Sequence, residues 1–192
     1  MNEEIIRNRH KVLAFVALWH VQQKRKYTGE PYLFHLQAVA EMADGKCPYG
    51  YEIGLCHDLL EDTICTEEEL GRALLRFGYT VNEANLIVEC VVELTDVWTP
   101  ENSPELNRKA RKTLEALRLH AISPTGQSVK YADLIDNTKS IVEHDPGFAK
   151  KYIQEKEAIL EGMDQGNKIL RRWCLKSLED AKLKLSKDER SN

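Results

Sequence analysis

The stretch LCHDLLEDT, residues 55–63, places one imidazole and three carboxylates close together, on His57, Asp58, Glu61 and Asp62. Imidazole and carboxylate groups together bind divalent metals, and a carboxylate beside a metal-bound water can accept its proton. These residue types therefore suit metal-assisted hydrolysis. The alternative is a solvated acidic helix face, because a lone His-Asp pair occurs by chance in many chains.

Helical spacing strengthens the first interpretation. At about 100° per residue, the four polar side chains would fall within about 140° of arc on one helix. Leu55, Leu59 and Leu60 interleave with them, so part of this helix must pack inward. Burying an ionised carboxylate without a partner costs several kcal/mol, and a divalent cation would offset that cost.

Two further candidate ligands lie elsewhere in the chain. His35 stands in PYLFHLQAVA and Asp133 in SVKYADLIDN, each among apolar residues. Alone, such a histidine is more often a hydrogen-bonded core residue, and such an aspartate more often a helix cap or ion-pair partner. Together with His57 and Asp58 they form an H…HD…D set, in which the sequence resembles the HD-domain phosphohydrolases. Mixed imidazole and carboxylate ligation suits Mn, Fe or Zn, and among these we expect Mn²⁺.

The composition bounds the class of protein. The chain has 192 residues, 42% hydrophobic and 30% charged, which suits a single domain with a real core. Its formal net charge of −4 argues against a nucleic-acid partner. No apolar run approaches the roughly 18 residues of a membrane span, and MNEEIIRNRH is unlike a secretory signal. Five cysteines without a CxxC pair are typical of reduced core thiols, so we expect a cytoplasmic protein.

Helical periodicity and helix-start signals run along the whole chain. The spacing of apolar residues predicts helices over 3–24, about 32–43, about 51–62 and 80–97. Further starts are predicted by Thr66 with Glu69, Ser103-Pro104, Ser123-Pro124 and Asp145-Pro146. No strand pattern is found, so we expect an all-α HD-domain helical bundle over residues 1–165. Residues 166–192 are expected to form a C-terminal amphipathic helix and polar tail, either part of that domain or appended to it.

Longer motifs sharpen the resemblance. WHVQQKRKYTGEPYLFH, residues 19–35, is similar to the opening of the RelA/SpoT-type alarmone hydrolase domain, A-H-x-G-Q-x-R-K followed by G-E-P-Y. LCHDLLEDT resembles that family's L-L-H-D-x-x-E-D-T, and ARKTLEAL and VKYADLIDNTKSI follow in the expected order. The similarity covers roughly residues 10–145. The chain resembles the small stand-alone form of the family.

The resemblance implies a reaction and a role for each matching residue. The reaction is hydrolysis of the 3′-diphosphate of guanosine tetra- or pentaphosphate, with release of pyrophosphate. The metal ligands would be His35, His57, Asp58 and Asp133, and the catalytic pair Glu61 and Asp62 would serve the metal-bound water. The substrate-binding residues would be Arg25, Lys26, Tyr32, Arg111, Lys112, Lys130 and Asn137.

Departures from the family pattern keep other functions open. Gln22 replaces a glycine, Leu36 stands where proline usually follows the first ligand, and the loop before Gly29 is one residue longer. These changes affect the substrate loop, so a phosphohydrolase acting on a deoxynucleotide or a phosphorylated nicotinamide dinucleotide is an alternative. A non-catalytic nucleotide-binding module is another, although it would not need Glu61 and Asp62. We expect a small-molecule nucleotide partner; the oligomeric state cannot be read from the sequence.

Overall fold

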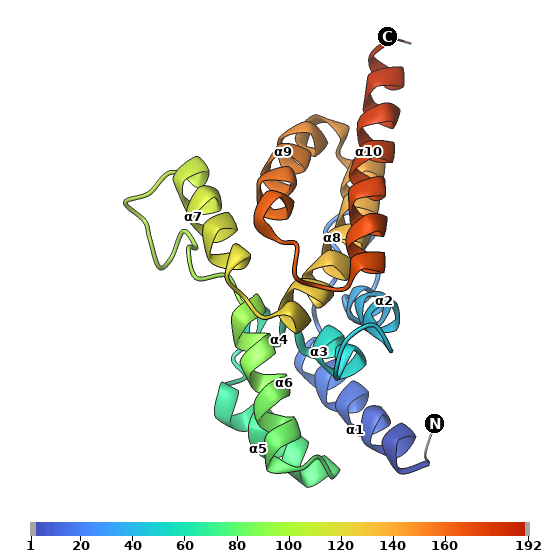
Figure 1. Cartoon of the computed structure of the whole chain (residues 1–192), viewed down its shortest axis with the longest axis vertical. Helices are drawn as coiled ribbons and strands as arrows, with labels where there is room; N and C mark the ends of the chain where they lie inside the picture. Colours follow the sequence, from blue (N-terminus) through green and yellow to red (C-terminus); the bar gives the residue numbers. More distant parts are fainter. Residues whose placement is uncertain (1–2, 191–192) are drawn as a thin grey trace. The chain divides into compact units, whose positions relative to one another are not determined.

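The computed structural model describes residues 3–190, and its regular elements there are ten α-helices (Figure 1). The expectation of an all-α fold is therefore confirmed. The chain divides into two compact units, residues 1–95 and residues 96–192. Within residues 3–190, no helix combines the length and the hydropathy that a membrane crossing requires.

The helices of each unit follow one another along the chain. The first unit contains α1 (Glu3–Trp19), α2 (Leu33–Ala43), α3 (Gly50–Cys56), α4 (Leu59–Asp62), α5 (Glu67–Phe77) and α6 (Val81–Leu94). The second unit contains α7 (Arg108–His120), α8 (Pro124–His144), α9 (Pro146–Gly162) and α10 (Lys168–Arg190).

Side-chain caps fix most of the helix starts. The Thr66 hydroxyl accepts from the Glu69 amide while the Glu69 carboxylate accepts from the Thr66 amide, which is a complete capping box. Ser123 and Asp145 cap α8 and α9, and each is followed by a proline in the first turn. These starts were predicted from sequence and are confirmed.

The start predicted at Ser103-Pro104 is wrong. Helix α7 begins at Arg108, where the Asn107 side chain accepts from an amide of the first turn. Upstream, the buried carboxylate of Glu115 accepts from the backbone amides of Val97 and Trp98 at 3.1 and 3.2 Å. These bonds hold the segment before α7 in an irregular path, so the local cap signal is overridden by a tertiary contact.

The helix expected over about residues 51–62 is divided in two. Helix α3 ends at Cys56, Asp58 has φ −98° and ψ 2°, and α4 begins at Leu59. The turn directs the Asp58 carboxylate back toward the ring of His57. The single continuous polar face predicted from sequence is therefore replaced by a bend, with His57 buried and Glu61 and Asp62 exposed.

Two glycines allow α3 to lie against the backbone of α2. A Cβ on Gly54 would lie 2.6 Å from the Ala40 Cα, and one on Gly50 would lie 2.3 Å from the Ala43 carbonyl oxygen. No side chain fits at such distances. Because α2 carries His35 and α3 leads directly into His57, this close packing sets how far apart the two imidazoles lie.

In the second unit, α8 packs against α9 and α10, and α9 packs against α7. The buried Tyr131 of α8 donates a hydrogen bond to the Met163 carbonyl at 2.7 Å, which ties α8 to the end of α9. Helix α10 continues to Arg190, so most of the predicted polar tail is helical; residues 191–192 lie outside the described part of the chain. The boundary predicted at residues 165–166 falls between α9 and α10 and stays a prediction.

Replacing Gly54 by alanine tests the close packing. We expect Gly54→Ala to lower the free energy of unfolding by about 1–3 kcal/mol, because the new methyl group overlaps backbone atoms of α2. Gly71→Ala is the matched control, since a Cβ there would meet only a Val88 methyl group at 3.8 Å. The control should gain up to about 1 kcal/mol from helix propensity. Urea unfolding of both variants measures this, and equal stabilities would contradict it.

Candidate active site

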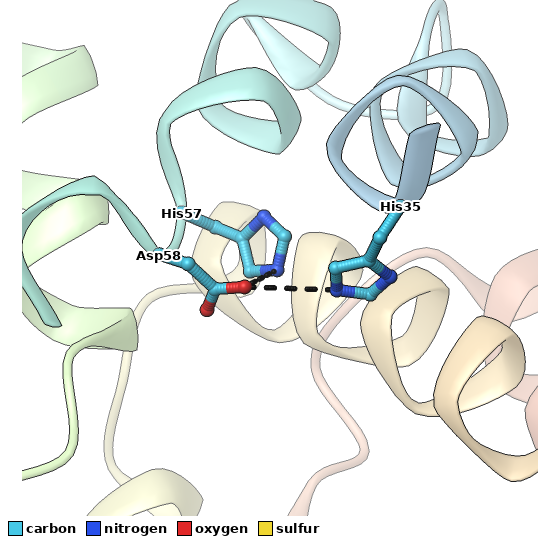
Figure 2. A group of neighbouring side chains, drawn as sticks. All are labelled: His35, His57 and Asp58. Atoms are coloured by element: carbon cyan, nitrogen blue, oxygen red, sulfur yellow. Dashed lines mark ion pairs between the residues drawn. The ribbon is translucent and has the colours of Figure 1, made fainter. Parts of the chain in front are cut away.

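Three predicted metal ligands converge in the first unit. His35 on α2, His57 at the end of α3 and Asp58 before α4 place their ligand atoms within 4.8 Å of one another. The Asp58 Oδ2 lies 3.0 Å from His57 Nε2 and 3.6 Å from His35 Nε2 (Figure 2). Both imidazoles are buried, at 2% and 1% exposure, so the cluster lies beneath the surface of the unit.

The hydrogen-bond partner of His57 Nδ1 determines the tautomer of this ring. The Nδ1 of His57 lies 2.8 Å from the Gly54 carbonyl oxygen, which can only accept a hydrogen bond. Nδ1 therefore carries the hydrogen, and in the neutral ring Nε2 presents a lone pair toward Asp58. This is the arrangement found for metal-binding histidines, whose second nitrogen is held by a carbonyl or carboxylate.

Tyr32 supports the same carboxylate. Its hydroxyl donates to Asp58 Oδ2 at 2.7 Å, and its ring lies 5.3 Å from the ring of His35 and 5.7 Å from that of His20. Hydrogen bonds to a ligating carboxylate fix its orientation. Tyr32, predicted as a substrate-binding residue, is thus placed beside the metal-ligand cluster, and its contact with substrate stays a prediction.

The donor set fits a divalent transition metal. Two imidazole nitrogens and a carboxylate oxygen are ligands that Mn²⁺, Fe²⁺ and Zn²⁺ accept, and three protein ligands leave positions for water or substrate. A divalent cation would also offset the charge of Asp58, which is held among buried rings. The cluster therefore supports the prediction of a metal site.

The predicted catalytic pair lies just beyond the cluster on α4. Glu61 and Asp62 are both exposed, and the Gln23 amide donates to Asp62 Oδ2 at 2.7 Å. Gln23 Oε1 in turn lies 2.5 Å from Nδ1 of the buried His20. Reduced hydration and then the charge of Asp58 raise the pKa of Asp62, while the hydrogen bond from Gln23 opposes that shift. A carboxylate with a raised pKa is better able to accept a proton near neutral pH.

The loop from His20 to Tyr32 carries the predicted diphosphate-binding pair. Its two arms are joined by hydrogen bonds from the Arg25 amide to the Glu30 carbonyl at 2.8 Å and from the Tyr32 amide to the Gln23 carbonyl at 3.0 Å. Gly29 has φ +72°, a left-handed value that favours glycine at this turn. Lys26 is exposed, with its ammonium 4.9 Å from the centre of the Tyr27 ring.

The fourth predicted ligand belongs to the second unit. Asp133 on α8 is 5% exposed, forms an ion pair with Lys130 at 2.9 Å and accepts a hydrogen bond from the Asn137 side chain. Lys130, Asp133 and Asn137 are thus brought together as successive turns of one helix. The structure places the other three ligands in the first unit, so the metal contact of Asp133 stays a prediction.

The remaining predicted substrate residues lie on α7. Lys112 pairs with Asp96 at 2.7 Å, while the Arg111 guanidinium donates to the Leu106 carbonyl. Burial alone would raise the pKa of Asp96, but Lys130 and Lys112 hold it below its usual value. Asp96, Lys112, Lys130 and Asp133 therefore interact within the second unit.

Three residues of these networks were given no role by sequence reasoning. His20 and Gln23 match the family motif but were assigned no function, and Lys156 on α9 belongs to no motif. Lys156 interacts electrostatically with Lys112, Lys130, Asp96 and Asp133. Its only sequence signal is Tyr152, four residues earlier and therefore on the same helix face.

Comparisons with known proteins bear on the fold and on the sequence resemblance. No protein-family model matches the chain. Over 140 residues, 68% of this chain, it is 31% identical to a probable guanosine-3′,5′-bis(diphosphate) 3′-pyrophosphohydrolase of Mycoplasma pneumoniae, and it spans 18% of that relative's length. A solved structure described as a metazoan ortholog of SpoT that hydrolyzes ppGpp has the same fold, with a TM-score of 0.73 and 20% identity. That alignment covers 90% of this chain and 94% of the other. The resemblance predicted from sequence is confirmed.

Metal analysis tests the cluster directly. We expect the purified chain to retain a divalent transition metal after dialysis, and His57→Ala to reduce the retained metal at least about tenfold, because a lost ligand costs no less than a lost supporting hydrogen bond. His10→Ala is the control, since His10 is an exposed histidine of the same unit. Elemental analysis of the three proteins measures this, and equal metal content in all three would overturn the assignment.

Proposed function

We propose that this chain is a metal-dependent phosphohydrolase that removes the 3′-diphosphate of guanosine tetra- or pentaphosphate as pyrophosphate. The observation that carries the proposal is the buried His35–His57–Asp58 cluster with Glu61 and Asp62 on the helix that follows it. The sequence match to a probable 3′-pyrophosphohydrolase and the shared fold with a ppGpp-hydrolysing protein support the choice of substrate.

His35, His57 and Asp58 would hold the metal, and Asp133 is the proposed fourth ligand. A bound Mn²⁺ would lower the pKa of a coordinated water and neutralise charge on the phosphoryl oxygens. Two hydrogen bonds prepare the ligands. The Gly54 carbonyl fixes the tautomer of His57, and the Tyr32 hydroxyl orients the Asp58 carboxylate. We propose Mn²⁺ because oxygen-rich phosphate substrates and mixed nitrogen and oxygen ligands both suit it.

Glu61 and Asp62 would manage the proton of the attacking water. Water attacks the phosphorus attached to the 3′ oxygen, and one of its protons passes to a carboxylate. The bond from that phosphorus to the 3′ oxygen breaks, and the leaving 3′ oxygen takes up a proton to become a hydroxyl. Pyrophosphate is released, and from the tetraphosphate guanosine 5′-diphosphate remains. The Gln23 amide keeps one Asp62 oxygen engaged, which orients the other oxygen of the carboxylate.

Arg25 and Lys26 would bind the diphosphate that leaves. Guanidinium and ammonium groups stabilise charge that moves onto phosphate oxygens during transfer. The hydrogen-bonded arms of their loop limit its freedom, so less ordering entropy is lost when an anion binds. Lys112, Lys130, Arg111 and Asn137 are the proposed contacts of the second unit to the nucleotide.

A different nucleotide is the alternative that one observation favours. The loop containing Gln22, Tyr27 and Thr28 departs from the family pattern in sequence and in length, and it carries the proposed phosphate-binding pair. A changed loop alters which phosphate arrangement fits. None of the five cysteines forms a disulfide within the described residues, which suits the reducing, cytoplasmic setting that we propose for the protein.

A side-by-side substrate assay tests the proposed activity. With Mn²⁺ present, we expect guanosine tetraphosphate to give a higher kcat/KM than deoxynucleoside triphosphates, nucleoside monophosphates or a phosphorylated nicotinamide dinucleotide. Pyrophosphate and guanosine 5′-diphosphate should form in equal amounts, as ion-exchange chromatography of the products will show. A higher kcat/KM for any competitor would reject the alarmone substrate, and turnover of none of them would reject the hydrolase.

Neutralising the catalytic pair tests its role. We expect the double variant Glu61→Gln, Asp62→Asn to lose about 10²–10⁴-fold in kcat while its metal content and melting temperature stay those of the wild type. Neither carboxylate belongs to the metal cluster, so metal binding should persist while proton transfer is lost. Glu67→Gln, on the exposed first turn of α5, is the control. A double variant within about threefold of wild-type kcat would show that other groups accept the proton.

A further inference from the structure

The orientation of the Asp62 carboxylate depends on one neighbour. Gln23 Nε2 donates to Asp62 Oδ2 at 2.7 Å, and no other group within residues 3–190 hydrogen-bonds this carboxylate. Oδ1 is therefore the oxygen that is left for the attacking water. Asp62 is exposed at the end of the four-residue helix α4, so little else restrains its side chain.

The Gln23 amide, in turn, is oriented by His20. A carboxamide donates from its nitrogen and accepts at its oxygen, so turning it over exchanges the two roles. Gln23 Oε1 lies 2.5 Å from His20 Nδ1, and because an amide oxygen only accepts, Nδ1 carries the hydrogen. In the reversed amide, the oxygen would face the Asp62 carboxylate and the NH₂ group would face the Nδ1–H. Both contacts are repulsive, so His20 favours the orientation that serves Asp62.

The His20 ring is itself held firmly. It is 3% exposed, and its backbone amide donates to the Val16 carbonyl at 3.1 Å, directly after α1. The ring stacks on Tyr32, with centres 5.7 Å apart and planes 25° from parallel. Its Nε2 is buried and has no hydrogen-bond partner among the described residues. The hydrogen bond from Nδ1 to Gln23 is therefore the polar contact through which this ring acts.

We propose that His20 is a positioning residue for the hydrolysis, because its Nδ1–H fixes the Gln23 amide and thereby keeps Asp62 Oδ1 available to the attacking water. The carboxamide between them has no ionisable proton, so the chain orients Asp62 and does not conduct its proton. A reacting group must be held by neighbours whose own positions are fixed, and a buried, stacked imidazole meets that requirement. The inference rests on the proposed function insofar as Asp62 accepts the proton of the water.

Two substitutions separate the hydrogen bond from the stacking of the ring. His20→Phe keeps an aromatic ring against Tyr32 but has no donor. His20→Asn loses the ring but keeps an N–H donor near the position of Nδ1, and it has no counterpart of Nε2. A residue that served only to pack on Tyr32 would tolerate the first change better than the second, whereas a positioning residue would tolerate the second better.

Steady-state kinetics of the full chain with Mn²⁺ and guanosine tetraphosphate provide the first test. We expect His20→Phe to lower kcat about tenfold, in the range found when a supporting hydrogen bond is lost. KM, metal content and melting temperature should stay those of the wild type, because His20 contacts neither substrate nor metal in this scheme. His20→Asn, assayed per metal-loaded protein, should retain most of kcat. His10→Phe, an exposed histidine on α1, is the control and should match the wild type.

A double variant shows whether His20 acts through Gln23. We expect Gln23→Leu to lower kcat by about as much as His20→Phe, and the two changes together to lower it no further. Independent effects on kcat would multiply, whereas residues in one chain of contacts are not additive. Multiplied losses would overturn the inference. Wild-type kcat in His20→Phe, a lower kcat in His20→Asn than in His20→Phe, or a loss of metal in His20→Phe would each overturn it as well.

Hydrogen exchange measured by NMR provides a second test that needs no substrate. The side-chain amide protons of Gln23, assigned by their absence in Gln23→Leu, should exchange slowly with solvent in the wild type and in His20→Asn. In His20→Phe they should exchange as fast as those of an exposed glutamine. This result supports the positioning of Gln23 by His20 even if guanosine tetraphosphate proves not to be the substrate. Equally slow exchange in His20→Phe would overturn it, whatever the enzyme hydrolyses.

Discussion

The close approach of α2 and α3 is the constraint on which the candidate site depends. Gly50 and Gly54 leave no room for side chains between the two backbones, so the helices meet at a distance set by main-chain atoms. His35 and His57, carried on these helices, have ring centres 5.2 Å apart. A pair of imidazoles placed by backbone contact varies less in position than a pair placed by flexible side chains. That rigidity is what a metal site with few protein ligands requires.

One oxygen atom then organises the polar groups around the imidazoles. Asp58 Oδ2 faces His57 and His35 and accepts the hydroxyl hydrogen of Tyr32. Tyr32 stacks on His20, whose ring contacts Gln23, and Gln23 reaches Asp62. The proposed ligands and the proposed water-activating carboxylate are therefore joined by a continuous set of contacts within the first unit. A change at any member of the set alters the geometry of the others.

Sequence reasoning succeeded where structure is decided locally. The caps at Thr66, Ser123 and Asp145 depend on hydrogen bonds within a few residues, and each helix begins where its cap predicted. It failed at Ser103-Pro104, in a segment that a carboxylate from the next helix holds at Val97 and Trp98, a contact that local sequence does not reveal.

The candidate site, too, was predictable only in part. The convergence of His35, His57 and Asp58 was predictable because the motif was long and specific, whereas the bend at Asp58 was not, because the helical spacing around it gives no sign of a break. Lys156 was not predictable at all, since the charges that single it out come from α7, α8 and the segment before α7.

The loop between His20 and Tyr32, whose two arms are joined by two backbone hydrogen bonds, constrains how this chain can diverge. The same short segment holds Asp62 through Gln23 and presents Arg25 and Lys26. An insertion or deletion there would change both the contacts of Arg25 and Lys26 with the leaving diphosphate and the orientation of the Asp62 carboxylate. Selectivity and turnover are thus mechanically linked, and a lineage that alters its preferred nucleotide through this loop must re-establish its chemistry at the same time.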